Sequence, residues 1–393
     1  MEGVRLVGRI GLPLPVALAA AALAVASAGC RQEKPAMAQR EAASPVNPPR
    51  QVADAPTDSC AEDAPAPLPI QATHVVARSA RLSALQPLTY AAGADPASDR
   101  PAHVRAASAV RAFAGGHWIA QDDANFLAIR GADGAVTALA LPAAADGRRL
   151  FSERDGNKKL KMDLEAAALL PDGRLCAFGS GSRKARTRIV VIDARPPAGP
   201  TTRMFEASAL YEALAACPAF AGAELNLEGA VVVGSKLRLF NRGNGNDEAK
   251  GQVATDASVD IDIAAFQAYL DGVGKRPPLR AVVRYQLGTL GGVRLTFTDV
   301  AALPDGRIAF LAAAEASPDA YHDGAVQGCR LGLIDGASVQ TFDVRGDDGA
   351  VCAIKLEGLE LAAATATSLR FWVVADVDDS DKPALMGTLT LDL

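Results

Sequence analysis

The chain has 393 residues, and its 40 Lys and Arg side chains against 45 Asp and Glu give a formal net charge of −5. This charge, without a basic stripe interleaved with aromatic residues, argues against nucleic acid as a partner. Only four His and no Cys-x-x-Cys pair are present, so a zinc site is not expected. Gly-x-Ser-x-Gly, a Walker A loop and His-Glu-x-x-His are also absent, which excludes three common hydrolase and nucleotide-binding classes.

The first 29 residues are typical of a secretory signal. Arg5 and Arg9 precede a short apolar run that ends in Ser27-Ala28-Gly29, directly before Cys30. The run is too short to span a membrane as a helix. Small residues before a Cys resemble a bacterial lipobox, which implies lipidation at Cys30; ordinary signal cleavage nearby is the alternative. We therefore predict a signal peptide over 1–29 and a membrane-anchored lipoprotein, periplasmic or on the cell surface, held through this lipid anchor.

Two further regions follow the signal. Residues 30–71 are rich in Ala, Pro and charge without hydrophobic periodicity, which predicts a disordered tether. Residues 72–393 form one domain that is longer than a single hydrophobic core usually supports. A ring of repeats can reach this length because each repeat packs only on its neighbours.

A short unit recurs along this domain. Its clearest copies are residues 164–175 and 297–308, in which a polar residue opens an apolar run, a Pro-Asp-Gly turn follows and a second apolar run returns. This pattern is typical of a β-hairpin. The aligned polar positions, spaced by 57 to 70 residues, are Ser108, Glu165, Glu228, Thr298 and Glu357. Such even spacing indicates a repeat architecture.

Two more strand-like runs follow the hairpins. They are residues 188–192 and 203–210 after the second copy, and 329–334 and 339–344 after the fourth. Four strands per repeat are typical of a β-propeller blade, and no sustained helical period competes with them. We therefore predict an all-β fold, a five-bladed β-propeller; six blades would require another blade within residues 83–104.

The two ends of the domain are expected to meet. The last copy leaves 37 residues, enough for about three strands, and residues 74–82 can supply the fourth. We predict that this N-terminal strand closes the last blade, because the pairing removes two exposed sheet edges.

Export would place the cysteines in an oxidising compartment. Besides Cys30 there are five, an odd number. Cys60 lies in the predicted tether and is expected to be the unpaired one. Cys329 and Cys352, on adjacent predicted strands, are the expected disulfide.

The aligned polar positions predict a metal site. The first strand of each propeller blade lines the central channel, so these positions share one mouth of it. Three carboxylates there raise one another's pKa unless a cation intervenes. Oxygen ligands without His or Cys suit calcium. The predicted calcium ligands are Ser108, Glu165, Glu228, Thr298 and Glu357; the alternative is a water-filled channel with solvated or partly protonated acids.

The loops around this mouth suggest an anion site. Residues 179–186 and 241–246 combine Gly, Ser and Asn with Arg and Lys, and so offer backbone and charged donors to an oxyanion. The alternative is solvated turns. Asp122 and Asp123 follow the first hairpin at the same mouth and are the candidate catalytic residues. The candidate ligand-binding residues are Ser180, Ser182, Arg183, Lys184, Arg186, Asn241 and Arg242.

Two resemblances add to these observations. Residues 72–393 resemble an uncharacterised family of bacterial exported propeller proteins, through blocks at 164–182, 227–245 and 297–317. More remotely, the aligned polar positions resemble the Ser, Glu, Glu, Ser, Glu series that the five-bladed soluble calcium-activated nucleotidases (apyrases) place around a central calcium. Asp122-Asp123 falls where that family has an Asp-Asp pair. No nucleotide-binding block matches.

Together these features predict an exported lipoprotein that binds calcium and hydrolyses a phosphate ester or anhydride. Calcium would polarise a phosphoryl oxygen, Asp122 or Asp123 would activate water, and Arg183, Lys184 and Arg242 would bind the anion. The alternative is a non-catalytic propeller that binds a ligand or a protein and holds a structural cation. A small anionic ligand and a monomeric state are expected.

Overall fold

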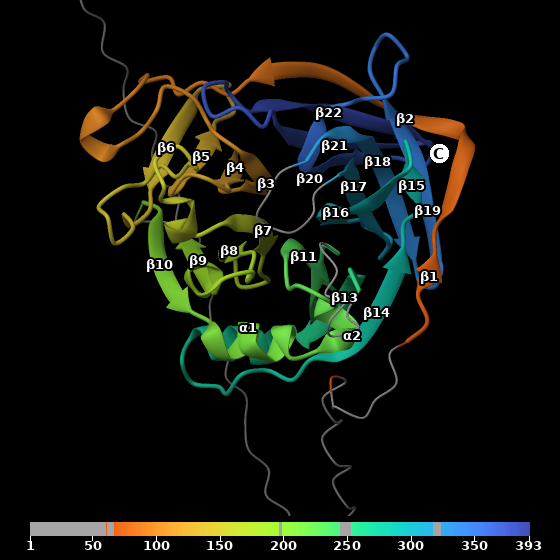
Figure 1. Cartoon of the computed structure of the whole chain (residues 1–393), viewed down its shortest axis with the longest axis horizontal. Coiled ribbons are helices and arrows are strands. Elements are labelled where there is room, and N and C mark those ends of the chain that lie inside the picture. The colour runs from red at the N-terminus through yellow and green to blue at the C-terminus, as the bar shows by residue number, and fades with distance from the viewer. Residues whose placement is uncertain (1–59, 61–66, 196–198, 244–252, 317–323) are drawn as a thin grey trace, which may run out of the picture. The chain divides into compact units, whose positions relative to one another are not determined.

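The computed structural model describes residues 60, 67–195, 199–243, 253–316 and 324–393 (Figure 1). The chain divides into two units, Met1–Ala53 and Asp54–Leu393, and all the described residues belong to the second. The predicted signal peptide, Cys30 and most of the predicted tether lie outside the described residues. Within those residues, no helix is long and apolar enough to cross a membrane.

Strands dominate the described residues, as predicted. They are β1 (Ile70–Gln71), β2 (Thr73–Pro87), β3 (Ala107–Phe113), β4 (Gly116–Gln121), β5 (Phe126–Arg130), β6 (Val136–Ala140), β7 (Leu164–Leu169), β8 (Leu175–Gly179), β9 (Arg188–Asp193), β10 (Thr201–Glu206), β11 (Leu227–Val233), β12 (Lys236–Asn241), β13 (Asp256–Asp262), β14 (Arg280–Gln286), β15 (Thr289–Leu290), β16 (Val293–Ala302), β17 (Ile308–Glu315), β18 (Val326–Asp335), β19 (Ser338–Arg345), β20 (Lys355–Ala364), β21 (Ser368–Asp376) and β22 (Leu385–Asp392). The all-β prediction is therefore confirmed. The strands predicted at 188–192, 329–334 and 339–344 are present as β9, β18 and β19.

Consecutive strands pair antiparallel in sheets. β3 to β6 form one four-stranded sheet and β7 to β10 another. β11 to β14 form a third, to which β1 adds a parallel edge strand. A nine-stranded sheet contains β15 to β19 and β20 to β22, joined by β2. The tight turns between β7 and β8 and between β16 and β17 have Gly173 and Gly306 at φ +84° and +89°, where only glycine is unstrained.

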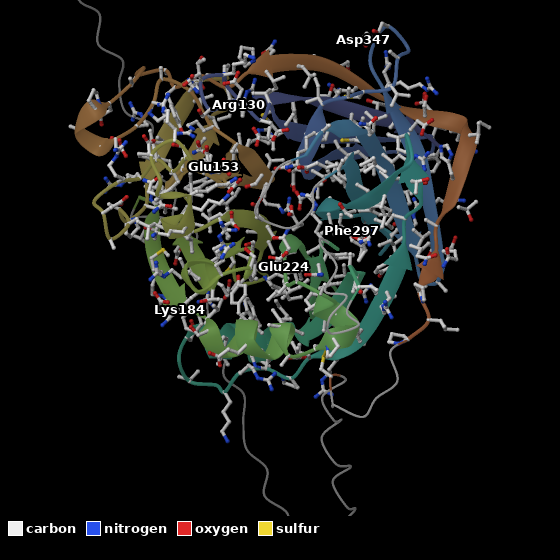
Figure 2. The ribbon with its side chains drawn as sticks, viewed as in Figure 1. Arg130, Glu153, Lys184, Glu224, Phe297 and Asp347 are labelled. Atoms are coloured by element: carbon white, nitrogen blue, oxygen red, sulfur yellow. A yellow bond between two sulfur atoms is a disulfide. The ribbon has the colours of Figure 1, made fainter. Side chains whose placement is uncertain are left out.

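The innermost strands surround one axis. β3 contacts β7, β7 contacts β11, β11 contacts β16, β16 contacts β20, and β20 returns to β3 (Figure 1). Sheets arrayed around an axis in this way form a β-propeller. Hydrophobic clusters fill the space between neighbouring sheets and hold each sheet to the next. Phe297, marked in Figure 2, packs edge-on against both Phe240 of one sheet and Phe310 of its own.

The N-terminal strand closes the ring, but in a different way from the prediction. β2 pairs antiparallel with β22, from Ala80 opposite Leu391 to Pro87 opposite Leu385, as expected. It also pairs parallel with β19, from Gln340 opposite Thr73 to Arg345 opposite Arg81, which the sequence did not indicate. One strand therefore covers the edges of two sheets, which leaves fewer backbone groups unpaired.

Three short helices were missed: α1 (Ser208–Ala215), α2 (Pro218–Ala221) and α3 (Ile263–Leu270). The strand expected over 203–210 ends at Glu206 as β10, and α1 follows. Leu210, Tyr211 and Leu214 are buried at helical spacing on α1, a pattern too short to stand out from the flanking strand signal.

The disulfide prediction was wrong. Cys60 is bonded to Cys217, whereas Cys329 and Cys352 are free and buried, as is Cys176. The Cys329 thiol donates instead to the Ile354 carbonyl at 3.0 Å. Cys60 packs against the core between the second and third sheets, so the segment taken for a free tether is fixed at this point. Spacing alone does not determine connectivity.

Candidate functional site

Each innermost strand carries a β-bulge at the aligned position of the repeat. In the first sheet, Ala107 and Ala109 pair with consecutive residues of β4, so Ser108 has no cross-strand partner. The other four innermost strands skip one residue in the same way. A bulge re-aims a side chain and is often found beside active sites. The bulged residues are Ser108, Glu165, Glu228, Thr298 and Glu357, all of them buried. They are the five positions that the sequence repeat aligned.

A guanidinium lies on the axis next to this ring. Arg111 forms a bidentate ion pair with Asp299, at 2.8 and 2.9 Å, and both residues are buried. It also donates to one backbone carbonyl from each innermost strand, each two residues after a bulge: those of Val110, Ala167, Ala230, Val300 and Leu359. One side chain therefore ties all five innermost strands together. The sequence offers only a weak signal for it, an Arg inside an otherwise apolar run.

The two hydroxyls of the ring link neighbouring strands. Ser108 Oγ donates to the Leu164 carbonyl, and Thr298 Oγ1 donates to the Leu356 carbonyl at 2.7 Å. Each acceptor directly precedes the next bulged residue. The hydroxyl protons are therefore used between strands, and only the lone pairs of the oxygens remain for a ligand.

Two of the three ring glutamates have cationic partners. Arg242 Nη1 lies 3.3 Å from Glu228, and Lys355 Nζ lies 2.8 Å from Glu357. Glu315 bridges the two cations, at 2.6 Å from Arg242 and 3.2 Å from Lys355. Burial raises the pKa of Glu228 to about 8, although Arg242 acts in the opposite direction. This half of the ring is largely neutralised by the protein itself.

The third glutamate is not neutralised. No hydrogen bond or ion pair of the Glu165 carboxyl group is found among the described residues, and the residue is only 8% exposed. Burial, followed by the charges of Asp122 and Glu228, raises its pKa well above the ordinary value. A buried carboxyl group in this state either holds a proton or requires a cation.

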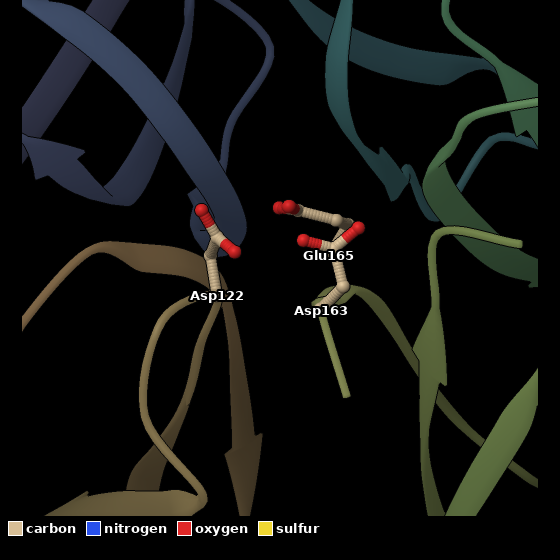
Figure 3. A group of neighbouring side chains, drawn as sticks. All are labelled: Asp122, Asp163 and Glu165. Atoms are coloured by element: carbon tan, nitrogen blue, oxygen red, sulfur yellow. The ribbon is translucent and has the colours of Figure 1, made fainter. Parts of the chain in front are cut away.

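Glu165 belongs to a cluster that could hold a metal ion. Carboxylate oxygens of Asp122, Asp163 and Glu165 all lie within 4.8 Å of one another, and Figure 3 shows the three side chains converging from two sheets. The ammonium group of Lys161 contacts Asp122 and lies 2.6 Å from Asp163. Arg186 Nη1 is 2.6 Å from the other oxygen of Asp163. Three carboxylates with oxygen donors only are suited to a hard divalent cation such as calcium.

The second predicted catalytic carboxylate lies beside this cluster. Asp123 Oδ2 accepts from Arg105, while its Oδ1 is buried and has no hydrogen-bond partner among the described residues. Burial raises the pKa of Asp123 to about 6, with a further contribution from Asp122. Burial acts to raise the pKa of Asp122, but the charges of Lys161 and Arg186, together with hydrogen bonds to Lys161 and Asp163, hold it below the ordinary value. The adjacent aspartates therefore differ in acidity.

Carboxyl groups outnumber cations in this network. Closely spaced carboxyl groups form a closed loop around the mouth, in which each group interacts with the next. In order, the loop contains Asp123, Asp122, Glu165, Glu228, Glu357 and Asp376, and Asp376 interacts with Asp123. Its eight carboxyl groups are Asp122, Asp123, Asp163, Glu165, Glu228, Glu315, Glu357 and Asp376; its five cations are Arg105, Lys161, Arg186, Arg242 and Lys355. The mouth can therefore accept further positive charge.

Most of the predicted anion-binding residues are engaged inside the protein. Arg186 and Arg242 are buried and paired with carboxylates, as described above. Ser180 Oγ donates to Asp163, and Asn241 donates to the Thr255 carbonyl at 2.9 Å. Ser182 Oγ accepts from Arg186 at 2.8 Å. Arg183 and Lys184 lie exposed at the turn η3 (Lys184–Arg186), and residues 244–252 of the second loop lie outside the described residues.

Several residues of the mouth were missed, although the repeat contains a signal for some of them. Asp163, Asn226, Thr296 and Lys355 each lie two residues before a bulged position. Asn226 donates to Glu228 at 2.7 Å, and Thr296 accepts from Arg242 at 3.1 Å. These four polar residues share the same position in the repeat and lie in otherwise apolar sequence. They form a second ring next to the ring of bulged residues.

Comparison with known proteins shows the family. Residues 103–391 match a family of unknown function, DUF6929, and the chain belongs to it. No curated protein matches the chain.

Several solved structures show some similarity to this chain. A streptogramin B lyase is 10% identical, with 78% of this chain and 97% of that chain covered at a TM-score of 0.37. A gluconolactonase from Xanthomonas campestris is 13% identical, with 79% and 98% covered at 0.33. A putative phosphatase from Bacteroides thetaiotaomicron is 9% identical, with 79% of each covered at 0.38. These three titles include no apyrase, and at such low similarity we infer nothing from them about this chain.

Proposed function

We propose that this domain is a five-bladed propeller that binds calcium at the mouth formed by the bulged residues and hydrolyses a phosphate ester or anhydride there. The observation that carries the proposal is the excess of carboxyl groups over cations at that mouth, together with the buried Glu165, for which no partner is found among the described residues. A divalent cation would offset the repulsion among Asp122, Asp163 and Glu165.

The number of blades rests on three observations. Five innermost strands contact one another in a closed cycle, and Arg111 donates to one carbonyl from each of them. Five hydrophobic clusters lie between successive sheets of the described residues. Residues 83–104, where a sixth blade would have to lie, contain the end of β2 and a 3-10 turn at Pro96–Ser98.

The residues of the cluster define separate roles. Asp122, Asp163 and Glu165 would hold calcium, which when bound supplies a Lewis acid for a phosphoryl oxygen. Asp123 is suited to accept a proton from water, because Arg105 fixes one of its oxygens and the other has no partner in the described part of the chain. With a pKa of about 6, its carboxylate is ionised at neutral pH yet more basic than an ordinary Asp.

We also propose that the protein is exported and anchored through Cys30, on the periplasmic or cell-surface side of a membrane. The apolar run before Cys30 supports this, and so does the disulfide between Cys60 and Cys217, since disulfides persist in oxidising compartments. The anchor would leave the propeller free to bind a small anionic ligand as a monomer.

A non-catalytic lipoprotein with a structural cation is the second candidate. The pairing of Glu228 with Arg242 and of Glu357 with Lys355 favours it, because these contacts stabilise the ring without any substrate. Calcium binding without turnover of any phosphate compound would identify this function.

Release of inorganic phosphate from a panel of phosphate esters and anhydrides tests the proposal, with calcium compared against a chelator. We expect calcium-dependent release that falls as the pH drops through about 6, because protonation removes the basic form of Asp123. Asp123→Asn should lower turnover by 100-fold or more, within the usual range of about 10²–10⁴ for a general base. Asp305→Asn, on an exposed turn at the opposite end of β16, is the matched control. Absence of calcium-dependent release across the panel would contradict the enzymatic part of the proposal.

A further inference from the structure

A cavity of about 470 Å³ opens beside the carboxylate cluster. Asp122 and Lys161 belong to its wall as well as to the cluster, so the two are continuous. Asp123 and Phe151 line it from the first sheet and the segment after β6, and Asp376 from the end of β21. Its volume is in the range that holds small molecules.

The net negative charge of the cavity wall disfavours the binding of an anion by itself. An anion can bind there when a divalent cation occupies the carboxylate cluster. Six acidic residues and four basic residues line the cavity. Three of the basic residues are engaged: Arg105 with Asp123, Lys161 with Asp122 and Asp163, and Lys158 with Glu153 at 3.7 Å. Without a bound cation, an oxyanion would meet net negative charge. A divalent cation at the cluster would offset this net negative charge.

One guanidinium in the cavity is available for a ligand. Arg154 is exposed, and no hydrogen bond or ion pair of its side chain is found in the part of the chain that the structure describes. Arg186 and Arg242, by contrast, are buried against carboxylates. A planar guanidinium binds phosphate-type oxyanions through two parallel hydrogen bonds.

We propose that this cavity binds the oxyanion group of a phosphate monoester, or of a compound of the same charge and shape, between Arg154 and a divalent cation held by Asp122, Asp163 and Glu165. This inference rests on the proposed function for the cation, but it requires no hydrolysis. The sequence predicted an anion site in the loops at 179–186 and 241–246. In this proposal the anion site lies instead at the segment between β6 and β7.

Phenylphosphonate is a suitable probe, because its carbon–phosphorus bond resists hydrolysis. Calorimetric titration into the full chain, with and without calcium, should show binding that depends on calcium. Arg154→Met should weaken this binding at least tenfold, and Arg154→Lys should weaken it less, because a point charge is retained without the fork. Arg78→Met is the matched control: Arg78 is also exposed, and no hydrogen bond or ion pair of its side chain is found among the described residues. The control should bind the probe as the unmodified protein does.

Each outcome can be read separately from the proposed function. Binding that needs Arg154, in a protein without phosphatase activity, supports the anion site and contradicts the hydrolysis. Calcium binding without any phenylphosphonate binding overturns the anion site and leaves the cation site standing. Equal affinity in the wild type and Arg154→Met, or a loss in Arg78→Met alone, would also overturn it. Since Arg154 is exposed, its replacement should leave the melting temperature unchanged, and a melting curve of each variant verifies this.

Discussion

Replacing Arg111 with Met is expected to destabilise the domain by about 3–5 kcal/mol, the usual cost of removing one partner from a buried ion pair. The change leaves the Asp299 carboxylate buried without its counter-charge and takes a donor from one carbonyl of each innermost strand. Asp299 would keep only backbone donors such as Leu359 N–H, at 2.8 Å. Urea unfolding measures the loss.

A second variant separates the charge from the packing. Arg111→Met combined with Asp299→Leu removes both charges, so we expect it to recover part of the lost stability relative to Arg111→Met alone. A loss below about 1 kcal/mol for Arg111→Met would contradict the role of this guanidinium as the link among the five innermost strands.

Replacing Lys161 with Met is expected to strengthen calcium binding by tenfold or more. The Lys161 ammonium lies between Asp122 and Asp163, where it partly offsets the charge that would attract a divalent cation. Its removal leaves these carboxylates in need of a counter-charge. We therefore expect the variant to melt at a lower temperature than the wild type in chelator and to recover when calcium is added, as linkage requires.

Lys159→Met is the control for this experiment, because Lys159 is exposed two residues away from Lys161. It should change neither the calcium affinity nor the melting temperature. A Lys161→Met variant that binds calcium no better than the wild type would show that Lys161 does not compete with a cation at this cluster.

The regular spacing of the repeat explains why the positions of the ring could be predicted. A hydrophobic strand that returns every 57 to 70 residues must present the same position to the axis each time, so Glu165, Glu228 and Glu357 could be aligned without a structure. The bulge that re-aims each of them could not be predicted, because it depends on one skipped residue in the pairing register.

The ion pairs of the mouth could not be predicted, because they join residues far apart in the chain. Arg111 and Asp299 are separated by 188 residues, and Arg242 and Glu315 by 73. Cysteine pairing and the parallel addition of β2 to β19 depend on the same long-range placement. The composition of the basic loops predicted that they bind an anion. In the structure, Arg186 and Arg242 are buried and form ion pairs with carboxylates of the protein itself.

Calorimetric titration of calcium into chelator-treated protein tests the central claim most directly. We expect one site with a dissociation constant of about 1 mM or below, in the range of extracellular calcium modules, and a rise in melting temperature with added calcium. Glu165→Gln, which removes the ring carboxylate that has no partner among the described residues, should weaken this binding at least tenfold. No heat and no change in melting temperature at about ten times that concentration would contradict the account.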